Sequence, residues 1–185
     1  MLWFLEYGAN AEKPAKLNVD GLNIMAMHQQ WMKFIGEQTI LTPHMGEMSR
    51  LCGLDVSELK EDPVARAYQY AEKSGGVLVL KDACTVVTDR NEKLYLNLSG
   101  NSGMATAGSG DVLSGIIASV LCMYLSCEEE RELSYKAAMA VSIHGLCGDI
   151  AREKKGSHGM TAKDMIEALT EVLKLAEVQS KGCEL

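Results

Sequence analysis

The residues of this sequence best suited to chemistry lie in one glycine-rich stretch, GNSGMATAGSGDVLSG, at residues 100–115. The stretch leads to a carboxylate, Asp111, and then to an apolar run. Glycines such as Gly108 and Gly110 let a backbone approach phosphate oxygens, because no Cβ stands in the way. A helix that begins near Asp111 would add unpaired N–H groups and a favourable dipole. The pattern predicts an anion-binding loop; a loop that merely leads into a helix is the alternative.

Asp111 requires a separate explanation, because a carboxylate beside a phosphate is repelled by it. One suitable role is that of a general base, which takes the proton from a hydroxyl that attacks phosphorus. The other is N-terminal capping of the helix, and one residue can serve both purposes. The loop is not a Walker A motif, because no lysine follows its last glycine. It also lacks the dinucleotide fingerprint, since Leu113 stands where the third glycine belongs.

Composition restricts the class of protein. The 185 residues are 47% hydrophobic and 23% charged, which indicates one globular domain over 1–185. A net charge of -7 argues against binding to nucleic acid or to anionic membranes. The six cysteines show no C-x-x-C spacing, so we expect reduced thiols and a cytoplasmic protein. The longest apolar run, 112–125, is interrupted by Ser114, Gly115 and Ser119, and predicts a buried helix too short to span a bilayer.

The elements that must position the loop follow an alternating order. Short apolar runs predict strands at 17–19, 39–41 and 77–81, and a hairpin at 84–89 and 93–97. Helical patterns cover 22–32, 44–52, 55–73, 111–126, 131–154 and 161–178, with a kink or a break at Pro63. Residues 1–14 show no regular pattern. This alternation predicts an α/β sandwich around a mostly parallel sheet.

Six ordered blocks resemble one family. They are NVDGLN (18–23), LTPHMGEMSRL (41–51), VLVLKDACTVV (77–87), NLSGNSGMATAGSGDVLSGIIAS (97–119), IHGLCGDIA (143–151) and GMTAKDMIEAL (159–169). Together they span about residues 16–170 and resemble the ADP-dependent NAD(P)H-hydrate dehydratases of the ribokinase-like superfamily. The resemblance implies a three-layer ribokinase-like sandwich. The chain is shorter than the family's domains, so we expect the N-terminal part of that fold to be missing.

The resemblance also implies an activity and a site. The family repairs NADHX and NADPHX by eliminating water at the expense of an adenine nucleotide (ADP, ATP or AMP) together with Mg²⁺. Its nucleotide contacts map onto Lys81, Asp82, Ala83, Cys84, Thr85, Asn101, Ser102, Gly103, Met104, Ala105, Thr106, Ala107, Gly108, Ser109 and Gly110. Its hydrate contacts map onto His44 and Asp111, and Asp111 occupies the catalytic-base position. Glu47 maps onto a position associated indirectly with Mg²⁺.

Several departures from the family pattern leave alternatives open. Asn18 replaces the first aspartate of the usual Asp-Ala-Asp, and Ser102 replaces a usual proline. Asp82 and Cys84 replace two glycines, which adds bulk and a negative charge beside the expected nucleotide. The alternatives are a small-molecule kinase of the same superfamily and a non-catalytic nucleotide-binding module. We further expect a homo-oligomer, or a separate chain that supplies the missing portion, to cover an otherwise open sheet.

Overall fold

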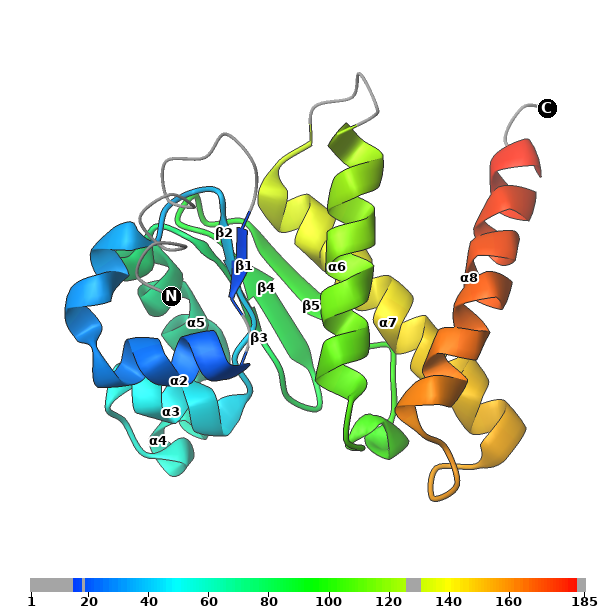
Figure 1. Cartoon of the computed structure of the whole chain (residues 1–185), viewed down its shortest axis with the longest axis horizontal. Helices are drawn as coiled ribbons and strands as arrows, with labels where there is room; N and C mark the ends of the chain where they lie inside the picture. The colour runs from blue at the N-terminus through cyan, green and yellow to red at the C-terminus, as the bar shows by residue number, and fades with distance from the viewer. Residues whose placement is uncertain (1–14, 18, 126–130, 183–185) are drawn as a thin grey trace.

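A five-stranded sheet forms the centre of the computed structural model, which describes residues 15–17, 19–125 and 131–182. The strand order is β1-β2-β3-β4-β5, and Figure 1 shows the sheet between two groups of helices. The strands are β1 (Ala15–Leu17), β2 (Thr39–Leu41), β3 (Val77–Leu80), β4 (Thr85–Thr88) and β5 (Leu94–Asn97). The irregular segment expected at 1–14 lies outside the described residues.

The sheet is of mixed orientation, which corrects the expectation of a mostly parallel one. Strands β1, β2 and β3 pair in parallel, whereas β3 with β4 and β4 with β5 pair antiparallel. The connections 81–84 and 89–93 are only a few residues long, and connections this short can join only antiparallel neighbours. The predicted hairpin and the strands at 39–41 and 77–81 are confirmed.

Helices cover both faces of the sheet, as Figure 1 shows. On one side lie α2 (Val19–Met27), the 3₁₀ helix η1 (Gln29–Phe34), α3 (Met45–Cys52), α4 (Val56–Glu61) and α5 (Pro63–Ser74). On the other side lie α6 (Ser109–Leu125) and α7 (Leu133–Lys155), and α8 (Ala162–Gly182) packs on α7. A short 3₁₀ helix, η2 (Ser102–Met104), interrupts the glycine-rich segment.

Strand β3 shows how the sequence produces these layers. Successive strand residues point to opposite faces. Leu78 and Leu80 accordingly pack in the core beneath α2–α5, while Val77 and Val79 pack beneath α6 and α7. All four are buried, which confirms that this apolar run is a strand covered on both faces. The buried sheet therefore holds the ends of β3, β4 and β5 in fixed positions.

Local signals set most helix boundaries and correct a few expectations. The strand predicted at 17–19 ends at Leu17, and Val19 already belongs to α2. The helix predicted at 22–32 ends at Met27 and continues as η1. The helix predicted at 55–73 is two helices, because Pro63 cannot sit in a helix interior and instead begins α5. The carboxylate of Asp62 accepts a hydrogen bond from the Ala65 N–H at 2.9 Å and caps that helix.

Within the described residues, no helix combines the length and apolarity needed to cross a membrane.

Candidate functional site

A cavity of about 560 Å³ opens at the edge of the sheet where β3 and β5 end and β4 begins. The glycine loop, defined as residues 100–110, forms one wall of it, and α7 forms another. Open α/β sheets bind ligands at the carboxyl ends of their strands. The described residues that line the cavity are Lys81, Asp82, Ala83, Thr85, Asn97, Ser99, Gly100, Asn101, Ser102, Met104, Ala105, Ser109, Gly110, Leu113, Val141, His144 and Gly145.

The glycine loop ends as the first turn of α6. Gly108 has a φ of 87°, a left-handed conformation that glycine adopts without steric cost. Its carbonyl oxygen accepts hydrogen bonds from the N–H groups of Asp111 and Val112, both at 3.0 Å. Helix α6 begins at Ser109, two residues earlier than expected, because this turn already has helical hydrogen bonding. The positive end of a 17-residue helix thus lies at the cavity.

Lys81 brings a cation to the same place. Its N–H donates to the Pro43 carbonyl at 2.8 Å, so the pairing of β2 with β3 continues to the end of both strands. A Cβ placed on Gly110 would lie 3.7 Å from the Lys81 Nζ, so the ammonium faces the start of α6. Burial lowers the pKa of Lys81, and the carboxylates of Glu47 and Asp111 oppose that shift. A partly buried ammonium beside a helix N-terminus is suited to hold a phosphate.

His44 and Glu47 form the start of α3. The Glu47 carboxylate accepts the His44 N–H at 2.7 Å, and the His44 Nδ1 accepts the Gly46 N–H at 3.0 Å. His44 is therefore the N-cap of α3, while its side chain is still 53% exposed and accessible to a ligand. Glu47 Oε2 lies 4.0 Å from the Lys81 Nζ, so the start of α3 adjoins the cavity through that lysine.

The Glu47 carboxylate fits an indirect role toward Mg²⁺. Its side chain is 1% exposed, and Oε1 has no hydrogen-bond partner among the described residues. His44 Nε2 is 3.6 Å away from it, too far for a hydrogen bond. Over the described part of the chain no cluster of three or more His, Cys, Asp or Glu could hold a metal ion. Mg²⁺ is usually held by one or two carboxylates with water and substrate phosphates, so a Mg²⁺ ion at Glu47 would need those additional ligands.

The structure gathers most of the positions expected to contact a nucleotide in one cavity. Those that line it are Lys81, Asp82, Ala83, Thr85, Asn101, Ser102, Met104, Ala105, Ser109 and Gly110. Those that do not line it are Cys84, Gly103, Thr106, Ala107 and Gly108, together with His44, Glu47 and Asp111. Asp111 is exposed in the first turn of α6, directly after Gly110 and close enough to Lys81 to act on its charge.

Seven lining residues were not anticipated as site residues: Asn97, Ser99, Gly100, Leu113, Val141, His144 and Gly145. From its apolar helix, His144 is expected to be a satisfied core histidine. The structure places it 9% exposed, at the cavity wall, with its Nε2 3.1 Å from the Ser109 carbonyl oxygen. Two of these residues, His144 and Gly145, belong to the block IHGLCGDIA, so that block is the sequence signal that could have identified them.

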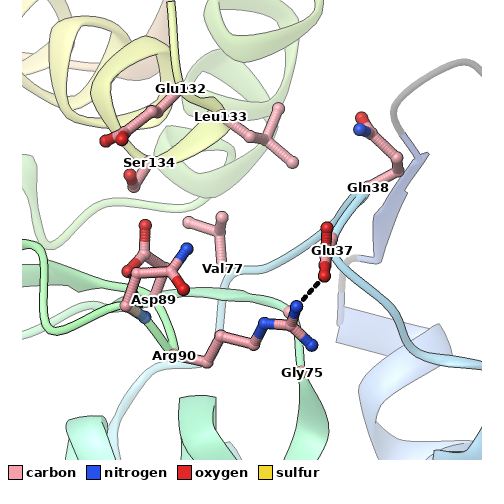
Figure 2. A pocket seen from close by; sticks show the side chains of 11 residues that line it. Glu37, Gln38, Gly75, Val77, Asp89, Arg90, Glu132, Leu133 and Ser134 are labelled. Carbon is pink, nitrogen blue, oxygen red and sulfur yellow. Dashed lines mark hydrogen bonds and ion pairs between the residues drawn. The ribbon is translucent and has the colours of Figure 1, made fainter.

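A second, smaller cavity of about 170 Å³ lies at the opposite end of the sheet, and Figure 2 shows its lining. It is bounded by the residues before β2 and β3 and by the start of α7. Arg90 forms an ion pair with Glu37, and Asp89 and Glu132 add further carboxylates. The buried hydroxyl of Ser134 has no hydrogen-bond partner among the described residues. Because Arg90 is paired with Glu37 and further carboxylates line the cavity, this cavity does not favour a phosphate.

Comparison with known proteins identifies the family of the chain. The family described as NAD(P)H-hydrate dehydratase (Carb_kinase) matches residues 1–171, a longer span than the 16–170 of the ordered blocks. The bifunctional NAD(P)H-hydrate repair enzyme Nnr of Thermofilum pendens is 42% identical over 165 residues, 89% of this chain and 30% of that protein. The ADP-dependent (S)-NAD(P)H-hydrate dehydratase of Neisseria meningitidis is 34% identical over 86% of this chain and 53% of its own length.

Solved structures give the same result for the fold. The ADP/ATP-dependent NAD(P)H-hydrate dehydratase of Bacillus subtilis, co-crystallised with ATP/Mg²⁺ and soaked with CoA, matches with a TM-score of 0.75 and 27% identity. The match covers 92% of this chain and 59% of that one. A ribokinase of Arabidopsis thaliana, at 19% identity and a TM-score of 0.53, shares the fold alone. The chain thus spans less than two thirds of each of these relatives and has the ribokinase-like α/β fold. The family match and these identities show that the chain belongs to the NAD(P)H-hydrate dehydratase family.

Proposed function

We propose that this chain binds an adenine nucleotide in the larger cavity and acts in the ADP-dependent dehydration of NADHX or NADPHX. The observation that carries the proposal is the approach of the Lys81 ammonium to Gly110, at the N-terminus of α6. An ammonium and a helix start directed at one point suit the terminal phosphates of a nucleotide. The Neisseria meningitidis relative is named for this reaction and the Thermofilum pendens relative for NAD(P)H-hydrate repair, and the similar Bacillus subtilis dehydratase was crystallised with ATP/Mg²⁺.

The chemistry assigns a separate role to Asp111. The hydroxyl of the hydrate attacks the terminal phosphorus, and Asp111 takes the hydroxyl proton as general base. A bond forms between the hydroxyl oxygen and the terminal phosphorus of ADP. The bond between that phosphorus and the rest of the nucleotide breaks, so AMP is the leaving group. Loss of inorganic phosphate and of a ring proton then restores the double bond of the dihydronicotinamide. Lys81 and the first turn of α6 stabilise the negative charge on the transferred phosphate.

Glu47 would hold Mg²⁺ beside these phosphates through water, and the bound ion would neutralise part of their charge. The buried Glu47 Oε1 supports this role, because it has no other partner among the described residues. His44 would contact the hydrate, and the exposure of its side chain at the start of α3 supports this role.

A second candidate function is a nucleotide-binding module without catalysis, and Asp82 is the observation that favours it. Its carboxylate lines the same cavity as Lys81 and would repel a nucleotide phosphate. Release of inorganic phosphate from ADP separates the candidates. We expect release that depends on added NADHX. Nucleotide binding without phosphate release would favour the module, and transfer of phosphate onto an alcohol without dehydration would favour a kinase.

Nucleotide binding should raise the melting temperature. A ligand that binds only the folded state stabilises it by RT ln(1 + [L]/Kd), so ADP at about 100 times Kd contributes roughly 2.7 kcal/mol. Lys81→Met should weaken ADP about tenfold or more, because it removes one charged phosphate contact. Thermal unfolding and calorimetric titration with ADP, each with and without Mg²⁺, measure both effects.

Lys60→Met is the matched control, because Lys60 is an exposed lysine of α4 that does not line the cavity. It should keep the full thermal shift. No shift in the native chain with millimolar AMP, ADP or ATP would contradict a formed nucleotide site. An equal shift in Lys81→Met and in Lys60→Met would place the nucleotide elsewhere.

A row of exposed leucines on the edge strand β5 and directly after it supports self-association. Leu94, Leu96 and Leu98 are between 47% and 83% exposed, and Leu96 pairs with Val86 of the core beneath α2–α5. Helix α5 packs on β3 and β4, so it leaves this side of β5 open. Exposed apolar rows on an open sheet edge normally mark interfaces. A homo-oligomer, or a separate chain that supplies the remaining part of the domain, would cover it.

Light scattering after size exclusion should therefore give a mass well above 20.1 kDa. Replacement of Leu96 and Leu98 by threonine should lower that mass, because β-sheet propensity is retained while apolar contact is lost. A monomer of 20.1 kDa at micromolar concentration that melts cooperatively would contradict the expected assembly.

The same proposal places the protein in the cytoplasm. Cys52, Cys84 and Cys147 are free thiols, as expected in a reducing compartment.

A further inference from the structure

Helix α7 contacts the glycine loop at two glycines of its own. A Cβ on Gly145 would lie 2.9 Å from the backbone carbonyl carbon of Ser99, just before the loop. A Cβ on Gly148 would lie 2.6 Å from the Cγ of Met104, inside the loop. Both distances are below any normal contact, so a larger residue at Gly145 would displace the Ser99 backbone, and one at Gly148 would displace the Met104 side chain. The block IHGLCGDIA thus provides a surface on which the loop rests.

Asp149, one turn after Gly145, holds the beginning of the loop. Its Oδ2 accepts the Gly100 N–H at 2.8 Å, and its Oδ1 accepts from the Asn101 Nδ2 at 3.2 Å. The same Asn101 Nδ2 donates to the Gly148 carbonyl at 2.9 Å. Gly100 has a φ of 102°, so the carboxylate holds the chain where it turns through a left-handed conformation. Hydrogen bonds to a carboxylate are stronger than neutral ones, and two of them converge here.

His144 holds the other end of the loop. Its Nε2 lies 3.1 Å from the carbonyl oxygen of Ser109, the first residue of α6. A carbonyl oxygen can only accept, so the proton of the neutral imidazole resides on Nε2. Because the Ser109 carbonyl and the Gly110 N–H share one peptide plane, a bond to the first fixes the second. His144 therefore holds the peptide plane between Ser109 and Gly110, directly before Asp111.

The electrostatic surroundings keep this histidine neutral. Burial lowers the pKa of His144 to about 4, and the nearby Lys81 ammonium acts in the same direction, against the hydrogen bond to Ser109. A neutral imidazole donates one hydrogen bond to the loop without adding charge to the helix N-terminus.

We propose that Asp149 and His144 are positioning residues that set the conformation of the glycine loop before a nucleotide binds. Gly100 and Ser109 lie at or next to the two ends of the loop, and α7 holds both through hydrogen bonds from one helix. A loop already held in its binding conformation loses less entropy when the ligand arrives. That the ligand is a nucleotide rests on the proposed function, whereas the ordering of the glycine loop by α7 does not.

Two measurements on four variants test this inference. Asp149→Asn leaves one acceptor where two bonds are needed, and His144→Phe keeps a ring without a donor. His144→Gln restores a donor, and Glu153→Gln removes an exposed acid elsewhere on α7 as the matched control. Calorimetric titration of the folded protein gives the Kd for ADP. Amide hydrogen exchange of residues 99–110 without ligand gives the order of the loop.

We expect Asp149→Asn and His144→Phe to raise the Kd about tenfold or more and to speed exchange in 99–110. His144→Gln should recover part of both losses, which a volume effect alone would not produce. Glu153→Gln should match the native chain. A Kd and an exchange pattern equal to those of Glu153→Gln in both disruptive variants would overturn the inference. Should the native chain bind no ADP, the proposed function fails, and the exchange measurement alone decides the role of α7.

Discussion

The Asp111→Asn variant should keep its nucleotide affinity and lose about 10²- to 10⁴-fold of its dehydration rate. The amide cannot take the proton of the attacking hydroxyl, whereas its size and its place in the first turn of α6 are unchanged. Phosphates are held by Lys81 and the backbone of the helix start, so the Kd for ADP should change by less than the rate. Initial rates with NADHX and ADP, together with calorimetric titration, measure the two quantities separately.

Asp164→Asn is the matched control, because Asp164 is also a first-turn aspartate but belongs to α8. Its carboxylate accepts hydrogen bonds from the N–H and hydroxyl of Thr161, and these bonds lower its pKa. This variant should lose some stability, because it weakens the start of α8, and keep its rate. If Asp111→Asn behaved in the same way, with less stability and an unchanged rate, Asp111 would be a capping residue and the catalytic role would be wrong.

Acidification should destabilise the native chain more than the His144→Gln variant. Burial lowers the pKa of His144 from 6.5 to about 4. Between these pH values the unfolded chain therefore binds a proton on this histidine, and the folded chain does not. Stability is therefore lost as the pH falls below 6.5, and the loss is complete near pH 4. A shift of this size corresponds to about 3 kcal/mol, because one pKa unit is worth about 1.4 kcal/mol.

Urea unfolding at fixed protein concentration, in steps from pH 7 to pH 4.5, measures this difference. Titrating carboxylates, including Asp164, contribute to both chains and cancel in the comparison. His158→Gln removes an exposed histidine and should retain the full pH dependence of the native chain. Equal slopes for the native chain and His144→Gln would show that His144 titrates normally and is not held neutral by burial.

Local chemistry made much of the fold predictable from the sequence. The apolar run at 77–80 and the break at Pro63 both involve neighbours in the chain. The position of the glycine loop between β5 and α6 follows from the same local order. Strand orientation was harder to predict. The alternation of strands and helices suggests a mostly parallel sheet, whereas short connections make β3 with β4 and β4 with β5 antiparallel.

The wall formed by α7 could not be predicted in the same way. His144 and Ser109 are 35 residues apart, and Asp149 and Gly100 are 49 apart. Helical periodicity records which side of a helix is buried, and His144 lies on such a side. Periodicity does not reveal that a polar loop, rather than an apolar core, covers it. The glycines at 145 and 148 carried that information, since Gly145 lies against the backbone of Ser99 and Gly148 against the side chain of Met104.

The most direct test of the whole account is the recovery of reduced nicotinamide from authentic NADHX. The chain is incubated with NADHX and ADP, with NADHX and ATP, or with NADHX alone, each with Mg²⁺, and the absorbance of the restored dihydronicotinamide is followed. We expect recovery that requires a nucleotide and is lost in Asp111→Asn. Absence of recovery with either nucleotide, from a chain that binds ADP with a normal thermal shift, would contradict a catalytic role.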